Sequence, residues 1–491
     1  MLIRSDLDRS LVSGVAWTAV MRWAGQIVSW GATFFAARLL TPADYGVLAM
    51  ATISIGLVRT VEDFGLDAIL VQDHSLSPSA QSELAGLIGV VGVILCAAFM
   101  MLANTIAEFF HEPRVTPMLL VLSVLCLTDA VQVVPRALLQ RDLAFKRLAL
   151  LQFVSITVTQ GTLVCAALAG VGFLALAFNS VAGAVAVTVL LFVWRPIAFK
   201  WPRTLRPLAN PLRQGLRMIA TRAAYYGYTY ADQTLIGRTL GKDDLGAYSF
   251  ATTFSGIPLQ EVGPIVTKVV PGVFSEVQDR RTELRRYFAL LTEFVAYLTF
   301  PMAVGLALTA DLLIPLLLGD QWQAVAAPTR VLCLYTLFGA SQLLVSHVML
   351  WTGQFRAQMW VTFLSAAIMP IAFWLAVDRG PVAIAWVWVV VYPITNIPAL
   401  MIAFRTVGIA ARGWFAALLP AAAACAAMAA GVIAVRSALP PSASPLVQLV
   451  ASIAMGATIY LACIALVFRN RVVTIIDLIW PNRRWLIAKT A

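Results

Sequence analysis

The chain has 491 residues, of which 60% are hydrophobic and only 12% are charged, and its formal net charge is +11. Charged residues make up about a quarter of an ordinary soluble domain. This composition therefore excludes a soluble globular fold and predicts an integral membrane protein.

Apolar stretches of roughly 20 residues recur along the chain, and each is long enough as a helix to cross about 30 Å of hydrocarbon. We predict an all-α polytopic membrane protein with about fourteen transmembrane helices. The predicted spans lie, in chain order, near residues 12–37, 45–71, 82–106, 116–136, 149–169, 173–194, 213–237, 245–272, 288–309, 325–350, 357–377, 381–404, 414–435 and 446–468. The first is too long for a signal-peptide core and lacks a following cleavage site, so we expect it to be retained.

One pattern occurs twice in the chain, 200 residues apart. Residues 38–56 read RLLTPADYGVLAMATISIG, and residues 238–256 read RTLGKDDLGAYSFATTFSG. The shared Asp-x-Gly, which is Asp44 and Gly46 in the first copy, precedes an apolar run. Because Asp is a good N-cap and Gly permits a tight turn, we interpret the motif as a helix start.

The same offset maps the first predicted span onto the seventh and the second onto the eighth. It predicts two six-helix lobes, residues 1–205 and 206–410, followed by two additional helices and a basic tail in residues 411–491. Because each lobe has an even number of helices, the two copies share one orientation, as in parallel-repeat transporters. This architecture favours alternating access to a central site.

The distribution of basic residues predicts the orientation. With the N-terminus inside, about 24 of the 35 Lys and Arg residues fall on the cytoplasmic side and about seven fall outside. Both termini are then cytoplasmic. All predicted loops are short, and the sequence shows no Walker motif, metal-binding cluster or nucleophile constellation. We therefore expect no cofactor, no metal and no enzymatic activity, and no nucleic-acid partner.

Three stretches carry a family resemblance: RLLTPADYGVLAMA near the start, PRALLQRDLAFKRLALLQ after the fourth span, and YADQTLIGRTLGKDDLGAYSFA in the second lobe. Their order and spacing resemble the Wzx-type polysaccharide flippases of the multidrug/oligosaccharidyl-lipid/polysaccharide superfamily. The resemblance implies a bacterial inner-membrane transporter for undecaprenyl-pyrophosphate-linked oligosaccharides, with that lipid-linked cargo and membrane lipids as partners, alongside polymerase and export machinery. It also implies a groove for the polyprenyl tail on the last two spans.

Four basic residues lie inside the predicted spans: Arg22, Arg59, Arg222 and Lys268. The resemblance implies a cationic central cavity for the cargo headgroup and suggests these four for its lining. Independently, a pyrophosphate diester carries about two negative charges, and the planar guanidinium fork suits phosphate oxygens. The alternative is local pairing.

Arg59 could form an ion pair with Glu62 or Asp63 on the same helix. Lys268 could extend to the membrane interface or form an ion pair with Glu261. Arg22 and Arg222 have no acidic residue within four positions.

The seventh span reads YYGYTYADQ over residues 225–233. Its aromatic and amide groups suit sugar rings, so Tyr228 and Gln233 are further candidates for substrate binding, although packing at the membrane interface is an alternative. Asp232, Glu261 and Glu62 are candidates for binding a coupling ion, with a structural counter-ion role as the alternative.

The eighth span contains Pro258, Pro264 and Pro271, so we expect an irregular helix that lines a cavity there.

The favoured function is a flippase for an anionic lipid-linked glycan. The first alternative is a multidrug or cation antiporter of the same superfamily, which the intramembrane Arg and Lys residues disfavour. A membrane glycan polymerase or ligase is less consistent with the sequence, because it would need a long outer loop with Arg or His clusters.

Overall fold

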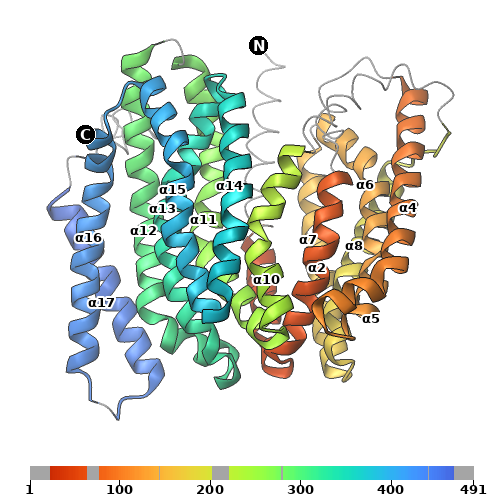
Figure 1. Cartoon of the computed structure of the whole chain (residues 1–491), viewed down its shortest axis with the longest axis horizontal. Coiled ribbons are helices and arrows are strands. Elements are labelled where there is room, and N and C mark those ends of the chain that lie inside the picture. Colours follow the sequence, from red (N-terminus) through yellow and green to blue (C-terminus); the bar gives the residue numbers. More distant parts are fainter. Residues whose placement is uncertain are drawn as a thin grey trace, which may run out of the picture. The chain divides into compact units, whose positions relative to one another are not determined.

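The computed structural model describes residues 21–62, 77–201, 220–277, 280–440 and 442–468 together with Arg471, apart from Arg22 and Leu143. In these ranges every regular element is a helix, and no strand occurs (Figure 1). The predicted all-α class is confirmed.

The described ranges hold ten helices that are long and apolar enough to cross a membrane. The count rises to eleven if Trp23–Leu39 and Pro42–Leu57, which meet at 119°, form one bent span. The total of fourteen stays a prediction, because the residues that start the first and seventh predicted spans lie outside the described ranges.

The first compact unit comprises Met1–Ser249. Its helices are Trp23–Leu39, α2 (Pro42–Glu62), α4 (Pro78–Phe110), α5 (Val115–Leu122), α6 (Val124–Arg141), α7 (Phe145–Leu168), the 3₁₀ turn η1 (Gly172–Leu174), α8 (Ala175–Trp194), the helical residues 220–229, α10 (Ala231–Thr239) and the first turns of α11 (Lys242–Val277). Buried side chains of α4 and α6, among them Ile88 and Val134, form one core cluster. Leu139, Leu151 and Leu191 join α6, α7 and α8 in a second.

The second compact unit comprises Phe250–Ala491. After the rest of α11 it contains α12 (Arg281–Leu318), η3 (Asp320–Val325), α13 (Ala326–Trp351), α14 (Phe355–Ala376), η4 (Val377–Arg379), α15 (Pro381–Val407), α16 (Ala411–Ala438) and α17 (Pro445–Leu466). Phe288, Val345 and Ala403 belong to a core cluster between α12, α13 and α15. Burying such side chains contributes about 1.5–3 kcal/mol each where the alternative is water.

The two additional helices, α16 and α17, pack on each other and on α12 (Figure 1). Phe300, Ala424 and Tyr460 share a core cluster at this contact. Near its end, α16 is also held by a bidentate ion pair, in which Arg436 Nη2 and Nη1 lie 2.6 and 3.2 Å from the two carboxylate oxygens of Asp311. The last two predicted spans therefore belong to the same compact unit as α12.

The compact units divide inside α11, between Ser249 and Phe250. The predicted lobe boundary after residue 205 stays a prediction, because residues 202–219 lie outside the described ranges. The prediction of an irregular eighth span is wrong in its secondary structure, since α11 is helical from Lys242 to Val277. A proline removes one hydrogen bond of the helix, and in α11 the helical path continues through each of these positions.

The repeated Asp-x-Gly motif starts a helix in both copies, as predicted, but its glycines have another role. At the start of α2, the Asp44 carboxylate accepts hydrogen bonds of 2.9 Å from the backbone N–H and the hydroxyl of Thr41. The backbone N–H of Asp44 donates back to the Thr41 hydroxyl over 3.3 Å, so the cap is reciprocal. The expected N-cap role of the Asp is wrong here, because Thr41 precedes the helix and Asp44 is its third residue. Gly46 instead lies within α2, where a Cβ atom would collide with the backbone carbonyl of Lys242.

Candidate functional site

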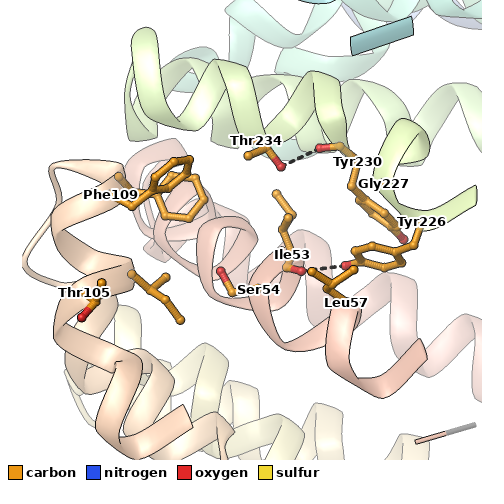
Figure 2. A pocket seen from close by; sticks show the side chains of 11 residues that line it. Ile53, Ser54, Leu57, Thr105, Phe109, Tyr226, Gly227, Tyr230 and Thr234 are labelled. Atoms are coloured by element: carbon orange, nitrogen blue, oxygen red, sulfur yellow. Dashed lines mark hydrogen bonds between the residues drawn. The ribbon is translucent and has the colours of Figure 1, made fainter. Parts of the chain in front are cut away.

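A pocket of about 320 Å³ opens in the first compact unit, between α2, α4, the helical residues 220–229 and α10 (Figure 2). Its lining is largely apolar, with hydroxyl groups at its edges. The lining residues are Ile53, Ser54, Leu57, Thr105, Ile106, Phe109, Phe110, Tyr226, Gly227, Tyr230 and Thr234. Cavities of this size hold part of a lipid chain or a sugar-sized group.

Hydrogen bonds to backbone carbonyls fix the tyrosine side of the pocket. The Tyr226 hydroxyl donates to the carbonyl of Ile53 over 2.8 Å, which ties the helical residues 220–229 to α2 (Figure 2). A Cβ atom on Gly56 would collide with this hydroxyl, so the tyrosine can approach because residue 56 has no side chain. The Tyr226 and Tyr230 rings lie 4.3 Å apart between centroids, and together they form one aromatic wall.

Asp232 lies one residue into α10 and is 1% exposed. The Tyr248 hydroxyl donates to its Oδ2 over 2.9 Å, and the backbone N–H of Gln233 donates to Oδ1 over 2.7 Å. Tyr248 lies in the first turns of α11 and is fully buried. Burying a carboxylate is costly unless donors replace its water, and these two donors stabilise it.

Ion pairs connect α2 and α11 to the turn that follows α4. Glu112 pairs with Lys242 through Nζ and Oε2 at 2.6 Å, and with Arg114 through Nε and Oε1 at 3.1 Å. Arg114 also approaches Asp44 at 3.5 Å. Burial raises the pKa of Glu112, but the hydrogen bonds and charges of Lys242 and Arg114 outweigh it and hold the pKa below its usual value of 4.5.

Arg238 of α10 holds the end of α4 in a second way. Its Nη1 donates to the carbonyl of Phe109 over 2.7 Å, and its guanidinium carbon lies 4.4 Å from the centroid of the Phe109 ring. The carbonyl belongs to the last turn of α4, where helix carbonyls lack intrahelical partners. Phe109, which lines the pocket, is thereby connected to α10.

Some of the predicted site residues lie within the described ranges, and others lie outside them. Arg222 is half-buried in the helical residues 220–229, Gln233 is half-buried in α10, and Glu261 is half-buried in α11. Tyr228 is buried against Tyr225, with ring centroids 5.4 Å apart, and it is not among the pocket residues.

Arg22 lies outside the described residues, as do the side chains of Arg59, Glu62 and Lys268. Whether the four basic residues line one cavity therefore stays a prediction.

Sequence reasoning singled out the tyrosine-rich stretch but did not identify its partners. Tyr248, Gly56 and Phe109 each contact the site from a distant position in the sequence. For Gly56 the sequence did contain a signal, because this glycine is repeated 200 residues later as Gly256. Nothing in the local pattern around Tyr248 indicated that it would donate to Asp232.

The fold and these features define a multi-pass helical membrane protein with a largely apolar pocket and a buried carboxylate. The sequence of residues 35–327 matches the family described as "Polysaccharide biosynthesis protein", and the chain belongs to this family.

Curated relatives agree with the family. The chain is 26% identical to the lipopolysaccharide biosynthesis protein WzxC of Escherichia coli K12 over 67% of each chain. It is 23% identical to the teichuronic acid biosynthesis protein TuaB of Bacillus subtilis 168, over 79% of this chain and 80% of that protein. It is 24% identical to the succinoglycan biosynthesis transport protein ExoT of Rhizobium meliloti 1021 over 58% of each chain.

Solved structures show the same fold at low identity. The lipid II flippase MurJ in an inward closed conformation aligns with a TM-score of 0.73 and 11% identity, over 93% of this chain and 99% of that one. An inward-facing multidrug resistance MATE family transporter of the MOP superfamily aligns with a TM-score of 0.53 and 12% identity, over 83% and 95%. The resemblance to this superfamily is confirmed at the level of fold.

Proposed function

We propose that this protein is a flippase that moves undecaprenyl-pyrophosphate-linked oligosaccharide units across the bacterial inner membrane. The cargo would serve the biosynthesis of a polysaccharide such as an exopolysaccharide, capsule or O-antigen. The observation that carries the proposal is family membership over residues 35–327, with relatives named for lipopolysaccharide, teichuronic acid and succinoglycan biosynthesis. The likeness in fold to a lipid II flippase supports it.

The proposed mechanism is alternating access without covalent chemistry. Arg222, a half-buried arginine in the helical residues 220–229, would bind the pyrophosphate together with its repeat equivalent Arg22. Arg59 and Lys268 would add positive charge. Because an ionised group costs roughly 2.5–3.5 kcal/mol at the centre of a bilayer helix, an arginine in a predicted span is consistent with a function that requires it.

Within the first compact unit, we place the contact with the cargo at Tyr226 and Tyr230. These rings form the aromatic wall of the 320 Å³ pocket and suit the apolar face of a sugar ring. Asp232 beside Tyr248 would respond to the coupling ion. Asp232→Asn removes the charge and keeps an oxygen for the Tyr248 hydroxyl, so transport should lose its dependence on the ion gradient. If the variant instead transports as the wild type does at every pH value and ion gradient, Asp232 has a structural role.

On the basis of the Lys and Arg distribution, we place both termini in the cytoplasm. The lipid-linked oligosaccharide would be the main partner, and a polymerase and export machinery would take the product.

The second candidate is a multidrug or cation antiporter, because the fold is similar to that of a MATE transporter. The names of the curated relatives and the arginines in the predicted spans favour the glycan instead.

Deleting the gene distinguishes between these two candidate functions. A flippase defect leaves lipid-linked oligosaccharide accumulated on the cytoplasmic leaflet and abolishes the polysaccharide, and complementation with the wild-type chain restores both. An antiporter defect would instead leave the polysaccharide intact and lower the resistance to cationic drugs. Unchanged lipid-linked oligosaccharide in the deletion strain would contradict the proposal.

A further inference from the structure

A second pocket, of about 690 Å³, lies entirely within the second compact unit, where α12 begins, α13 turns into α14, and α15 ends. Unlike the pocket beside α2, its lining is mainly polar and carries two basic side chains. The lining residues are Arg281, Leu284, Trp351, Thr352, Gly353, Gln354, Arg405 and Thr406.

The local sequence explains this shape. Helix α13 ends at Trp351, and Gly353 takes a left-handed conformation with φ of 75°, which reverses the chain within three residues. The N–H of Gln354 donates back to the carbonyl of Met349 over 2.8 Å and closes the turn. Helix α14 then begins at Phe355. Across the pocket, α15 ends at Val407, followed by Gly408 with φ of 76°.

Two basic side chains give the pocket positive charge. Arg281 and Arg405 are exposed, and neither forms an ion pair with an acid among the described residues. Glu283, two residues after Arg281, pairs with Arg286 at 3.8 Å instead.

Exposed apolar side chains border the pocket. Leu350 and Phe355 flank the turn and are 53% and 52% exposed, and Leu284 and Trp351 contribute apolar surface inside the pocket. A free anion needs only the charged groups. A phospholipid needs both a polar cradle for its phosphate and an apolar border for its glycerol and acyl carbons, and both occur here.

We propose that this pocket binds the phosphate group of an anionic phospholipid headgroup, with Arg281 and Arg405 as its principal donors. Gln354 supplies a further polar group. The hydroxyls of Thr352 and Thr406 donate to the carbonyls of Val348 and Ile402, so they can accept hydrogen bonds from headgroup hydroxyls. The predicted orientation places this end of the second compact unit on the cytoplasmic side, so the lipid belongs to the inner leaflet. The proposal does not depend on the nature of the transported cargo, because a bound phospholipid would stabilise this helix end in any transporter of this fold.

The test uses the full-length protein, purified in a mild detergent and titrated with phosphatidylglycerol or phosphatidylcholine, with bound lipids counted by native mass spectrometry. The Arg281→Gln, Arg405→Gln double variant should bind phosphatidylglycerol at least about tenfold more weakly than the wild type, because two charge-assisted contacts are lost. The matched control is the Arg285→Gln, Arg412→Gln double variant, which removes the same charge from two exposed residues outside the pocket. The control should bind as the wild type does.

Two further measurements distinguish the source of the phosphate and guard against misfolding. Inorganic phosphate should fail to displace phosphatidylglycerol at millimolar concentration. Displacement that depends on Arg281 and Arg405 would identify a site for free phosphate and overturn the lipid assignment. If the double glutamine variant does not fold, Thr352→Glu places a like charge in the pocket and should also weaken binding at least about tenfold. Equal weakening in the pocket and control variants would overturn the proposal, since it would mean nonspecific surface attraction.

Discussion

Gly46 of α2 and Gly246 of α11 face each other across a helix crossing, and each lies against the first residue of the other helix. A Cβ atom on Gly46 would collide with the carbonyl oxygen of Lys242, and one on Gly246 would collide with the carbonyl oxygen of Pro42. The 200-residue repeat relates these two contacts to each other. The two copies of the motif therefore pack against each other, which explains why both require glycine.

Alanine at either glycine should force this crossing apart. A backbone carbonyl cannot move aside as a flexible side chain can, so Gly46→Ala or Gly246→Ala should destabilise the protein by about 1–3 kcal/mol. Thermal unfolding of the purified variants measures the loss. Gly305→Ala is the matched control, because no atom lies within 4 Å of a Cβ built there. Unchanged stability in both crossing variants would mean that α2 and α11 do not approach so closely.

Tyr248→Phe should destabilise the protein through Asp232. The substitution removes the hydroxyl that donates to Oδ2 and leaves a buried carboxylate oxygen without this donor, at a cost of about 1–3 kcal/mol. The loss would appear as a lower midpoint in thermal unfolding. Tyr287→Phe serves as the control, because Tyr287 is half-buried and its hydroxyl forms no hydrogen bond within the described residues. The double variant with Asp232→Asn should recover part of the loss, since an amide is cheaper to bury than a carboxylate.

The pairing of Glu112 with Lys242 predicts a defined pH dependence. Because the pKa of Glu112 in the folded protein lies below its usual value of 4.5, its stabilising effect is fully present above that value. The effect is lost as the pH falls through the lower, folded-state pKa. The difference in melting temperature between the wild type and Glu112→Gln should be constant from about pH 5.5 to 8 and should shrink below about pH 4.5. A constant difference down to pH 3 would contradict the predicted shift.

Arg22 and Arg222 should act as an equivalent pair on the pyrophosphate. Replacing either with Ala removes charge-assisted hydrogen bonds worth roughly 1.5–3 kcal/mol, so export should fall at least about tenfold while the protein still inserts. Lysine keeps the charge without the planar fork and should retain part of the activity, and Glu should be worse than Ala. Export of polysaccharide in a complemented deletion strain measures the effect. Wild-type export by well-expressed Ala and Glu variants at both positions would rule out the cationic-cavity mechanism.

The orientation can be tested with reporter fusions. The bias of about 24 to seven in Lys and Arg predicts a cytoplasmic location after Arg206 and a periplasmic one after Lys242. A phosphatase reporter active only outside, paired with a fluorescent reporter active only inside, should give opposite signals at the two sites. The reverse pattern would overturn the proposed orientation of all spans, and with it the inner-leaflet assignment of the Arg281 pocket.

The sequence by itself determined the class, because hydropathy and helix length depend only on consecutive residues. The spans that became α4, α7, α8 and α12 to α17 could be read directly from apolar runs, and the two helix starts at Asp44 and Asp244 could be read from the repeat. The order and spacing of three motifs also indicated the family to which the chain belongs.

Only the tertiary structure decided which side chains meet. The pairing of Asp232 with Tyr248, the contact of Tyr226 with Gly56, and the ion pair of Glu112 with Lys242 each join residues from different segments of the chain. The observed role of Gly46 differs from its predicted role for the same reason. A local pattern predicts a glycine that permits a turn, whereas the observed glycine permits another backbone to approach. Helical periodicity specifies the face on which a residue lies, but the neighbour of that face is set by packing between segments that are far apart in the chain.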